Sequence, residues 1–260
     1  MNTELKAYGA RGLKVDFPVL DMHAHVGNSH YRASPCMDRQ VAEMDRLGIK
    51  QAVISSVDSI YGDISAGNTR TIEAVTRYPK HLLGYCFVGA QYPELILSEL
   101  ERCFAIDGFR GIKIYQTGAD FDHPLFEPAF EFAAAHKAPV LAHTWRGNLT
   151  GFDRAAERFP DVAFFAAHTG SGYSHEAYIE AALRTPNLYL DLTYSREHTN
   201  MIETLVAEVG ADRAVWGSDA PTFSMSHQLG KILFARIPDD DKKKILYDNA
   251  AALFGLEEGA

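Results

Sequence analysis

Eight short apolar runs recur along the chain, and a helix-length segment separates each run from the next. The runs cover residues 19–25, 51–57, 82–88, 111–116, 139–144, 162–169, 187–193 and 214–220. Apolar runs of this length between turn residues predict buried strands, and the segments between them place apolar residues at helical spacing. Strands and helices are therefore expected to alternate along the whole chain.

This alternation predicts a parallel sheet covered by helices, because each helix returns the chain to begin the next strand in the same direction. Strand ends lie roughly 24 to 32 residues apart, the length of a strand–helix unit with short loops. Eight such units predict an α/β protein of one domain, residues 1–260. We expect a single (β/α)8 TIM barrel with its active site at the C-terminal ends of the strands. An open doubly wound sheet is the alternative, but the first turn, HAHVGNSH, lacks the usual glycine fingerprint.

The amino-acid composition indicates which kinds of partner and which cellular location to expect for the protein. A hydrophobic fraction of 47% with 23% charged residues predicts a globular protein with a sizeable core. The formal charge of -9 argues against a nucleic-acid partner, since a phosphate backbone would be repelled. The sequence has no run of 18 uncharged apolar residues, so we predict no membrane segment. Cys36, Cys86 and Cys103 have no CxxC spacing, which favours reduced thiols and a cytoplasmic protein.

Side chains alternate along a strand, so the sequence also predicts which residues face the barrel interior. In the first strand one alternating set is apolar, and we expect it beneath the helices: Leu20, Met22 and Ala24. The other set is polar, and we expect it to face the interior: Asp21, His23 and His25.

The same alternation applies to the later strands. It turns Lys113 and Tyr115 inward in the fourth run and His143 inward in the fifth. It places three further polar residues on these inward faces: His168, aligned with Phe164 and Ala166, then Asp191, and finally Asp219, aligned with Val215 and Gly217. These polar residues converge on the C-terminal mouth, where barrel enzymes build their active sites.

Convergence at the mouth makes the HxH pair at His23 and His25 informative. In a chain with eleven histidines, chance alone would produce about half of one such pair. Two residues apart on a strand, however, both imidazoles can reach one ion. His143 and Asp219 lie at strand ends from which they could complete the shell. Individually, His143 could be a hydrogen-bonded core histidine, and Asp219 could cap a turn before Pro221.

From about Val19 to Leu256 the chain resembles the amidohydrolase superfamily, and within it the branch that includes aminocarboxymuconate-semialdehyde decarboxylase-like enzymes. The resemblance rests on these segments: DMHAH, GIKIY, FEPAFEFAAAHKAPVLAHT, FAAHTG, PNLYLDLT, DRAVWGSDAP and ILYDNAAALFGL. It implies one divalent ion with a bound water, most often zinc and with manganese possible. The implied ligands are His23, His25, His143 and Asp219, and His168 is implied to lie beside the ion and assist catalysis.

The chemistry of such a site agrees with these implied roles. A bound metal lowers the pKa of water to about 7 and so supplies hydroxide at neutral pH. Asp219 would take the proton of this water and pass it to a leaving group. His168 would orient the water or polarise a carbonyl.

Three residues are candidates for substrate binding. Related superfamily members use a carboxylated strand-four lysine to bridge two metals, so Lys113 could do this, although we favour a single ion. Lys113 could instead bind a substrate carboxylate or pair with Asp191. Arg146 could grip a carboxylate with both nitrogens or be an ordinary surface arginine. Tyr115 is expected to line the pocket.

We therefore expect a metal-dependent hydrolase that uses a metal-activated water to cleave an amide, ester or lactone bond of a small, carboxylated molecule. The alternative is a metal-dependent nonoxidative decarboxylase of an aromatic or unsaturated carboxylic acid, a reaction that the resembling branch also contains. Short loops favour hydrolysis. A third reading is a noncatalytic or metal-free member of the family. The resemblance also implies a homodimer.

Overall fold

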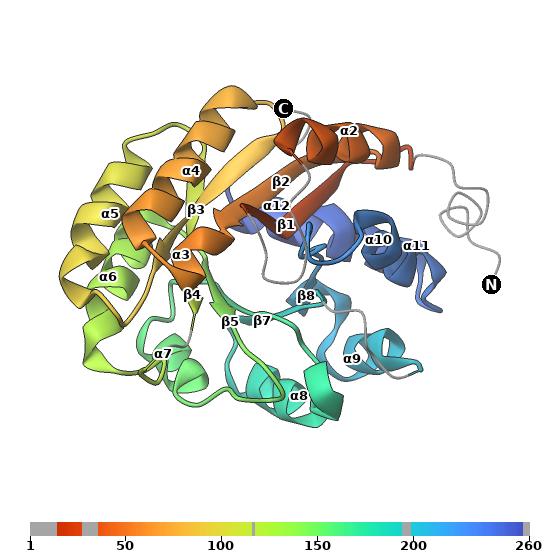
Figure 1. Ribbon diagram of the computed structural model, residues 1–260. Coiled ribbons are helices and arrows are strands. Elements are labelled where there is room, and N and C mark those ends of the chain that lie inside the picture. The colour runs from red at the N-terminus through yellow and green to blue at the C-terminus, as the bar shows by residue number, and fades with distance from the viewer. Residues whose placement is uncertain (1–14, 28–35, 116–117, 194–198, 257–260) are drawn as a thin grey trace.

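Eight parallel strands lie in the order in which they occur in the chain, and they form a barrel surrounded by helices (Figure 1). The computed structural model describes residues 15–27, 36–115, 118–193 and 199–256. The strands are β1 (Val19–Val26), β2 (Ile49–Ser56), β3 (Leu82–Val88), β4 (Phe109–Tyr115), β5 (Val140–His143), β6 (Phe164–Ala166), β7 (Leu188–Asp191) and β8 (Ala214–Val215). Each predicted apolar run overlaps one of these strands.

The barrel closes between β1 and the chain that follows β8. Met22 N donates to Trp216 O over 3.1 Å, and Asp219 N donates to His23 O over 2.7 Å. These backbone hydrogen bonds join the first strand to the last, which an open sheet would leave apart. The predicted TIM barrel is therefore confirmed, and the doubly wound alternative is wrong.

Helices follow the strands and cover the outside of the barrel (Figure 1). The longer ones are α2 (Met37–Leu47), α4 (Ile64–Arg77), α5 (Ile96–Phe104), α6 (Glu127–His136), α7 (Phe152–Arg158), α8 (His175–Arg184), α9 (Met201–Val209) and α10 (Met225–Phe234). Shorter ones are α3 (Val57–Tyr61), α11 (Asp239–Lys243) and α12 (Asn249–Leu253). Local signals set several ends: the Asp63 side chain accepts from Ala66 N at the start of α4, and α2 ends at Gly48 with φ of 80°.

Two hydrophobic clusters fill the molecule, one outside the sheet and one inside it. The outer cluster packs strand residues such as Ile112, Ile114 and Val140 against the helices. The inner cluster takes residues from strands on all sides of the barrel and from the C-terminal helical segment: Val53, Leu83, Leu141, Phe165, Val215, Tyr247, Ala250 and Phe254. This packed interior supports the residues at the mouth from below.

The prediction for the faces of β1 is partly wrong. Leu20 and Met22 lie in the inner cluster rather than beneath the helices, and only Ala24 packs outside. The register with β2 shifts between Val19 and Leu20 and again between Asp21 and Ala24. These irregularities break the two-residue period, so simple alternation fails for the first half of the strand.

The prediction that His168 faces the mouth of the barrel is correct, but the predicted faces of the β6 residues before it are wrong. Phe164 and Ala166 pack in the outer cluster, whereas Phe165 and Ala167 pack in the inner one. Continued alternation would therefore have turned His168 outward. The strand ends at Ala166, and His168 adopts a left-handed backbone with φ of 59°, which takes it out of the strand pattern.

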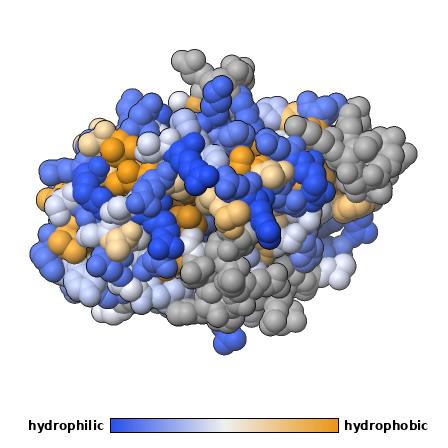
Figure 2. Space-filling model, turned by 45° about the horizontal axis from the view of Figure 1, so that its top comes forward, coloured by the Kyte–Doolittle hydropathy of each residue, from blue (hydrophilic) through white to orange (hydrophobic). Residues whose placement is uncertain are grey.

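The face drawn in Figure 2 mixes hydrophilic residues with smaller groups of hydrophobic ones. Large hydrophobic side chains that are exposed in the described part of the chain are Tyr61, Tyr92, Leu97, Trp145, Leu183 and Phe234. Among the described residues, no helix has both the length and the apolar character that crossing a bilayer requires.

Candidate active site

Three predicted metal ligands come together at the C-terminal end of β1. His23 and His25 project from this strand, and Asp219 follows β8; all three are buried. Asp219 Oδ1 lies 3.0 Å from His25 Nε2 and 3.9 Å from His23 Nε2. One ligand atom from each residue lies within 4.8 Å of the other two. Two imidazole nitrogens and a carboxylate oxygen in this arrangement suit a divalent transition metal ion.

His23 is oriented by Asp191, which lies 168 residues later in the chain. Its Nδ1 lies 2.7 Å from Asp191 Oδ2, and its Nε2 lies 3.0 Å from Lys113 Nζ. An ionised carboxylate accepts and an ammonium donates, so both contacts favour a proton on Nδ1 and a lone pair on Nε2. This is the tautomer that a metal ligand needs. The sequence prediction placed Asp191 at the pocket without recognising this role.

His25 is also fixed through its Nδ1. That atom lies 3.2 Å from Ser55 O and 3.1 Å from Ser55 Oγ at the end of β2. The contacts leave Nε2 facing Asp219. Ser55 was not predicted as a site residue, because a serine near a strand end carries no signal of its own.

His143 lies beside His168 and outside the group formed by the other three ligands. His168 Nδ1 lies 2.7 Å from Thr193 O, which can only accept, so His168 carries its proton there. His168 Nε2 must then accept from His143 Nδ1, 3.1 Å away. This leaves the lone pair of His143 on Nε2. Burial lowers the pKa of His168 to about 4, which keeps its ring neutral at pH 7.

Two aromatic rings lie near the His143 ring and roughly parallel to it. Tyr115 stacks on it with centroids 4.1 Å apart and an interplanar angle of 22°. Trp145 lies almost parallel to it, with an angle of 8° at 6.1 Å. Trp145 is 38% exposed. These three rings form an aromatic wall at the mouth, which we call the aromatic row.

Lys113 lies beneath the site and is 1% exposed. Burial lowers its pKa to about 8, against the opposing effect of the carboxylates of Asp219 and Asp191. Its Nζ lies 3.0 Å from His23 Nε2, so the amine contacts one of the three grouped residues directly. The predicted inward direction of Lys113 is therefore confirmed.

Asp219 and His168 share an uncommon backbone conformation. Their φ angles are 55° and 59°, in the left-handed region that non-glycine residues rarely adopt. Burial by itself would raise the pKa of Asp219. The hydrogen bond with His25 and the electrostatic interactions with His168, His25 and Lys113 outweigh burial and hold that pKa below its ordinary value. Asp219 is therefore ionised at neutral pH.

Arg146 lies on the loop after β5 and is exposed. Its backbone N donates to Ser171 Oγ, 2.8 Å away on the loop after β6. Its φ is 54°, and the next residue, Gly147, has φ of 71°. This tight turn places the arginine on the exposed loop after β5, and its predicted role in binding a carboxylate stays a prediction.

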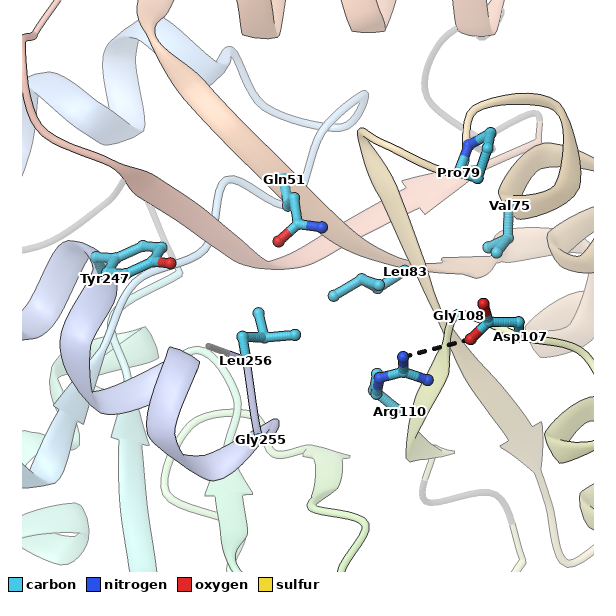
Figure 3. A pocket seen from close by; sticks show the side chains of 10 residues that line it. All are labelled: Gln51, Val75, Pro79, Leu83, Asp107, Gly108, Arg110, Tyr247, Gly255 and Leu256. Atoms are coloured by element: carbon cyan, nitrogen blue, oxygen red, sulfur yellow. Dashed lines mark hydrogen bonds and ion pairs between the residues drawn. The ribbon is translucent and has the colours of Figure 1, made fainter. Parts of the chain in front are cut away.

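A pocket of about 270 Å³ lies away from these residues (Figure 3). It is lined by the first residues of β2 to β4 and by the C-terminal segment, including Gln51, Leu83, Arg110 and Leu256. In Figure 3 Arg110 pairs with Asp107 across its edge. The pocket is thus at the N-terminal end of the strands and contains none of the predicted site residues.

Known proteins resemble this chain in sequence and in fold. A gamma-resorcylate decarboxylase from Polaromonas sp. strain JS666 is 24% identical over 285 residues, which cover 84% of this chain and 87% of the relative. An uncharacterized TIM-barrel protein from Bordetella bronchiseptica has the same fold, with a TM-score of 0.76, 20% identity and coverage of 92% and 99% of the two chains.

A dihydroxybenzoic acid decarboxylase from Polaromonas sp. JS666, solved with manganese and the inhibitor 2-nitroresorcinol, superposes with a TM-score of 0.71. It is 20% identical, with coverage of 92% of this chain and 96% of that chain. The amidohydrolase family profile matches residues 20–256. Because this match spans most of the sequence, the chain belongs to the amidohydrolase family.

Proposed function

We propose that the chain is a metal-dependent nonoxidative decarboxylase of a small aromatic or unsaturated carboxylic acid. The observation that carries the proposal is the aromatic row of Tyr115, His143 and Trp145 beside the group of metal-binding residues. Such a wall suits a flat, conjugated ring. The decarboxylase relatives support this second prediction from the sequence better than hydrolysis, which was the first.

We propose that His23, His25 and Asp219 hold one divalent ion and that His143 adds Nε2 as a fourth ligand. When bound, the ion would supply positive charge that neutralises a substrate carboxylate and polarises nearby oxygen atoms. The manganese in the dihydroxybenzoic acid decarboxylase favours manganese here, with zinc as the alternative. A second ion on a carboxylated Lys113 is disfavoured, because the Lys113 amine already contacts His23 Nε2.

Decarboxylation breaks a carbon–carbon bond, releases carbon dioxide and requires a proton on the carbon that keeps the electron pair. We assign this proton transfer to Asp219. Because its depressed pKa leaves Asp219 ionised, its carboxylate would first take a proton from a water molecule and then pass that proton to this carbon, and solvent would neutralise the hydroxide that is left. His168 is neutral and fixed by Thr193 O, which suits it to orient the reacting group rather than to supply the proton.

The same proposal gives three residues a place in substrate binding. Arg146 would pair with the substrate carboxylate from the rim, and guanidinium and carboxylate match in shape. Tyr115 would contact the ring from the wall. Lys113 would contribute positive charge from below, where it is buried.

The test is to incubate metal-loaded protein with aromatic carboxylic acids, small lactones and amides in ¹⁸O-labelled water. We expect one carbon dioxide released for each acid consumed, no label in the organic product, and complete loss of turnover with a chelator. Hydrolysis of a lactone or amide with ¹⁸O incorporation and no carbon dioxide would support the hydrolase instead. Turnover that survives the chelator would support the metal-free reading.

Three further predictions accompany this proposal. We propose a single domain over residues 1–260, a homodimer by analogy with the family, and a cytoplasmic location. Size-exclusion chromatography with light scattering measures the oligomeric state directly.

A further inference from the structure

Asp21 is a buried carboxylate that the proposed reaction does not use. It is 0% exposed and lies on β1, two residues before His23. Its Oδ1 accepts from Ser218 N over 2.8 Å and from His23 N over 3.3 Å. Its Oδ2 accepts from Ser218 Oγ over 2.5 Å. One side chain thus binds the backbone of a metal-binding histidine and the residue immediately before Asp219.

The segment that contains Ser218 is irregular, and its position is not set by sheet pairing alone. β8 ends at Val215, and Asp219 has the left-handed φ of 55°. Ser218 Oγ also accepts from Ala220 N over 3.0 Å, so this hydroxyl links both sides of Asp219 to Asp21. The turn that presents the aspartate ligand is therefore tied to the strand that presents the histidine ligands.

Close packing leaves little freedom for this turn to move. A Cβ on Gly217 would lie 2.4 Å from His23 Cβ, so the two segments touch through backbone and Cβ atoms. The hydrogen bonds of Asp21 act here together with backbone hydrogen bonds from Asp219 N to His23 O and from His25 N to Ala220 O, which also join the turn to β1.

We propose that Asp21 and Ser218 form a clamp that positions Asp219 relative to His23 and His25, and so sets the affinity of the metal site. The clamp rests on the proposed metal site but not on the identity of the reaction. Asp21 acts through Asp219 and is a positioning residue. A carboxylate is required because three donors converge on its two oxygens, whereas an amide would turn a donor toward one of them.

The test compares Asp21→Asn and Ser218→Ala with the wild-type protein in the metal-free state. Co²⁺ and Mn²⁺ are titrated in; the visible absorption of bound Co²⁺ reports coordination, and release to a chelator reports the dissociation rate. We expect affinity to fall about 10- to 100-fold for Asp21→Asn, the usual cost of losing a group that supports a ligand. The Co²⁺ spectrum should change, and Ser218→Ala should show a smaller effect of the same kind.

Tyr85→Phe is the matched control. Tyr85 Oη donates to Met22 O over 2.8 Å, so the variant also removes a buried hydrogen bond to β1 but leaves the clamp intact. Metal affinity and the Co²⁺ spectrum should stay near wild type in this control. Circular dichroism and thermal melting of the metal-free proteins establish that each variant is folded.

The clamp also predicts coupling. Because Asp21 and Ser218 act through shared hydrogen bonds, the double variant should lose less metal affinity than the two single losses combined.

Ser218→Ala keeps the backbone hydrogen bond to Asp21, so it supplies the test if Asp21→Asn does not fold. Wild-type affinity and spectrum in folded Asp21→Asn or Ser218→Ala would overturn the clamp while leaving the proposed decarboxylase intact. A decarboxylation assay that fails while metal affinity follows the clamp overturns only the proposed function.

Discussion

His23 Nδ1 lies 2.7 Å from Asp191 Oδ2, although 168 residues separate the two in the chain. A carboxylate at the end of β7 thereby holds a histidine on β1 in the tautomer that leaves Nε2 for a metal ion. Thr193 N donates to the other oxygen of Asp191 over 3.0 Å and fixes the carboxylate in turn. The orientation of the His23 ring thus depends on a residue of β7, a strand far from β1 in the sequence.

Replacing Asp191 with Asn should weaken metal binding about 10- to 100-fold, because the amide can present a donor to His23 Nδ1 and favour the wrong tautomer. The metal content of protein dialysed against a fixed free Mn²⁺ concentration measures this. Asp107→Asn, which changes an exposed aspartate beyond the other end of the barrel, serves as the control. Equal metal content in both variants would show that Asp191 has no part in ligand orientation.

Removing a ligand directly should have a larger effect. We expect His23→Ala and Asp219→Asn to abolish turnover while the proteins stay folded, since each loses one of the three grouped donors. Turnover and circular dichroism are measured together, with His227→Ala as a control because His227 is an exposed histidine on α10. Turnover near the wild-type rate in either ligand variant contradicts the assigned site.

Gly217→Ala should damage the site through packing alone. The added Cβ would lie 2.4 Å from His23 Cβ and 2.5 Å from Thr193 Oγ1, so backbone segments would have to separate. We expect lower thermal stability and weaker metal binding, measured by melting with and without Mn²⁺.

Gly230→Ala is the matched control, because a Cβ there meets nothing within 4 Å and Gly230 lies inside α10. Alanine should stabilise this helix by about 0.5–1 kcal/mol. If both glycine variants behaved alike, close approach at Gly217 would not matter.

Glu99, which lies away from the candidate active site, should make a pH-dependent contribution to the free energy of unfolding. It accepts from Ser65 Oγ and Asn68 Nδ2, each over 2.9 Å, and from Arg102 over 2.7 Å. Burial by itself would raise the pKa of Glu99, but these hydrogen bonds outweigh it and lower the pKa from 4.5. The folded state therefore favours the ionised form, and this stabilisation is complete above the unfolded pKa.

Glu99→Gln should lower the free energy of unfolding by about 1–3 kcal/mol at pH 7. The difference from wild type should shrink as the pH falls below 4.5 and through the depressed pKa, because the wild-type carboxylate is then protonated. Urea unfolding at several pH values measures this, and Glu101→Gln, at an exposed position on α5, should show no such trend. A difference that grew toward low pH would reverse the assigned sign.

Much of the fold and part of the candidate site could be predicted from residue types and spacing. The eight apolar runs were sufficient for a parallel barrel, because each strand must be buried on both faces. Lys113 could be assigned to the interior since β4 is regular between Ile112 and Ile114, both of which pack outside. Regular strands obey alternation, and alternation can be read without any knowledge of distant contacts.

Irregular backbone limited the same reasoning elsewhere. Leu20 and Met22 face the inner cluster because the register of β1 with β2 shifts. No residue type in VLDMHAHV indicates that shift. His168 reaches the mouth through a left-handed turn after β6 ends. Both departures are features of the backbone, the register of β1 and the φ angle of His168, and the spacing of apolar residues does not report either one.

By itself the sequence determined the barrel, the C-terminal location of the polar residues and the chemical types available to hold an ion. Only the tertiary structure decided how those groups are oriented: Asp191 against His23, and Asp21 against Ser218, pairs separated by 168 and 197 residues. The physical reason is that hydrophobic periodicity is local, whereas tautomers and ligand positions depend on hydrogen bonds that exist only once the barrel has closed.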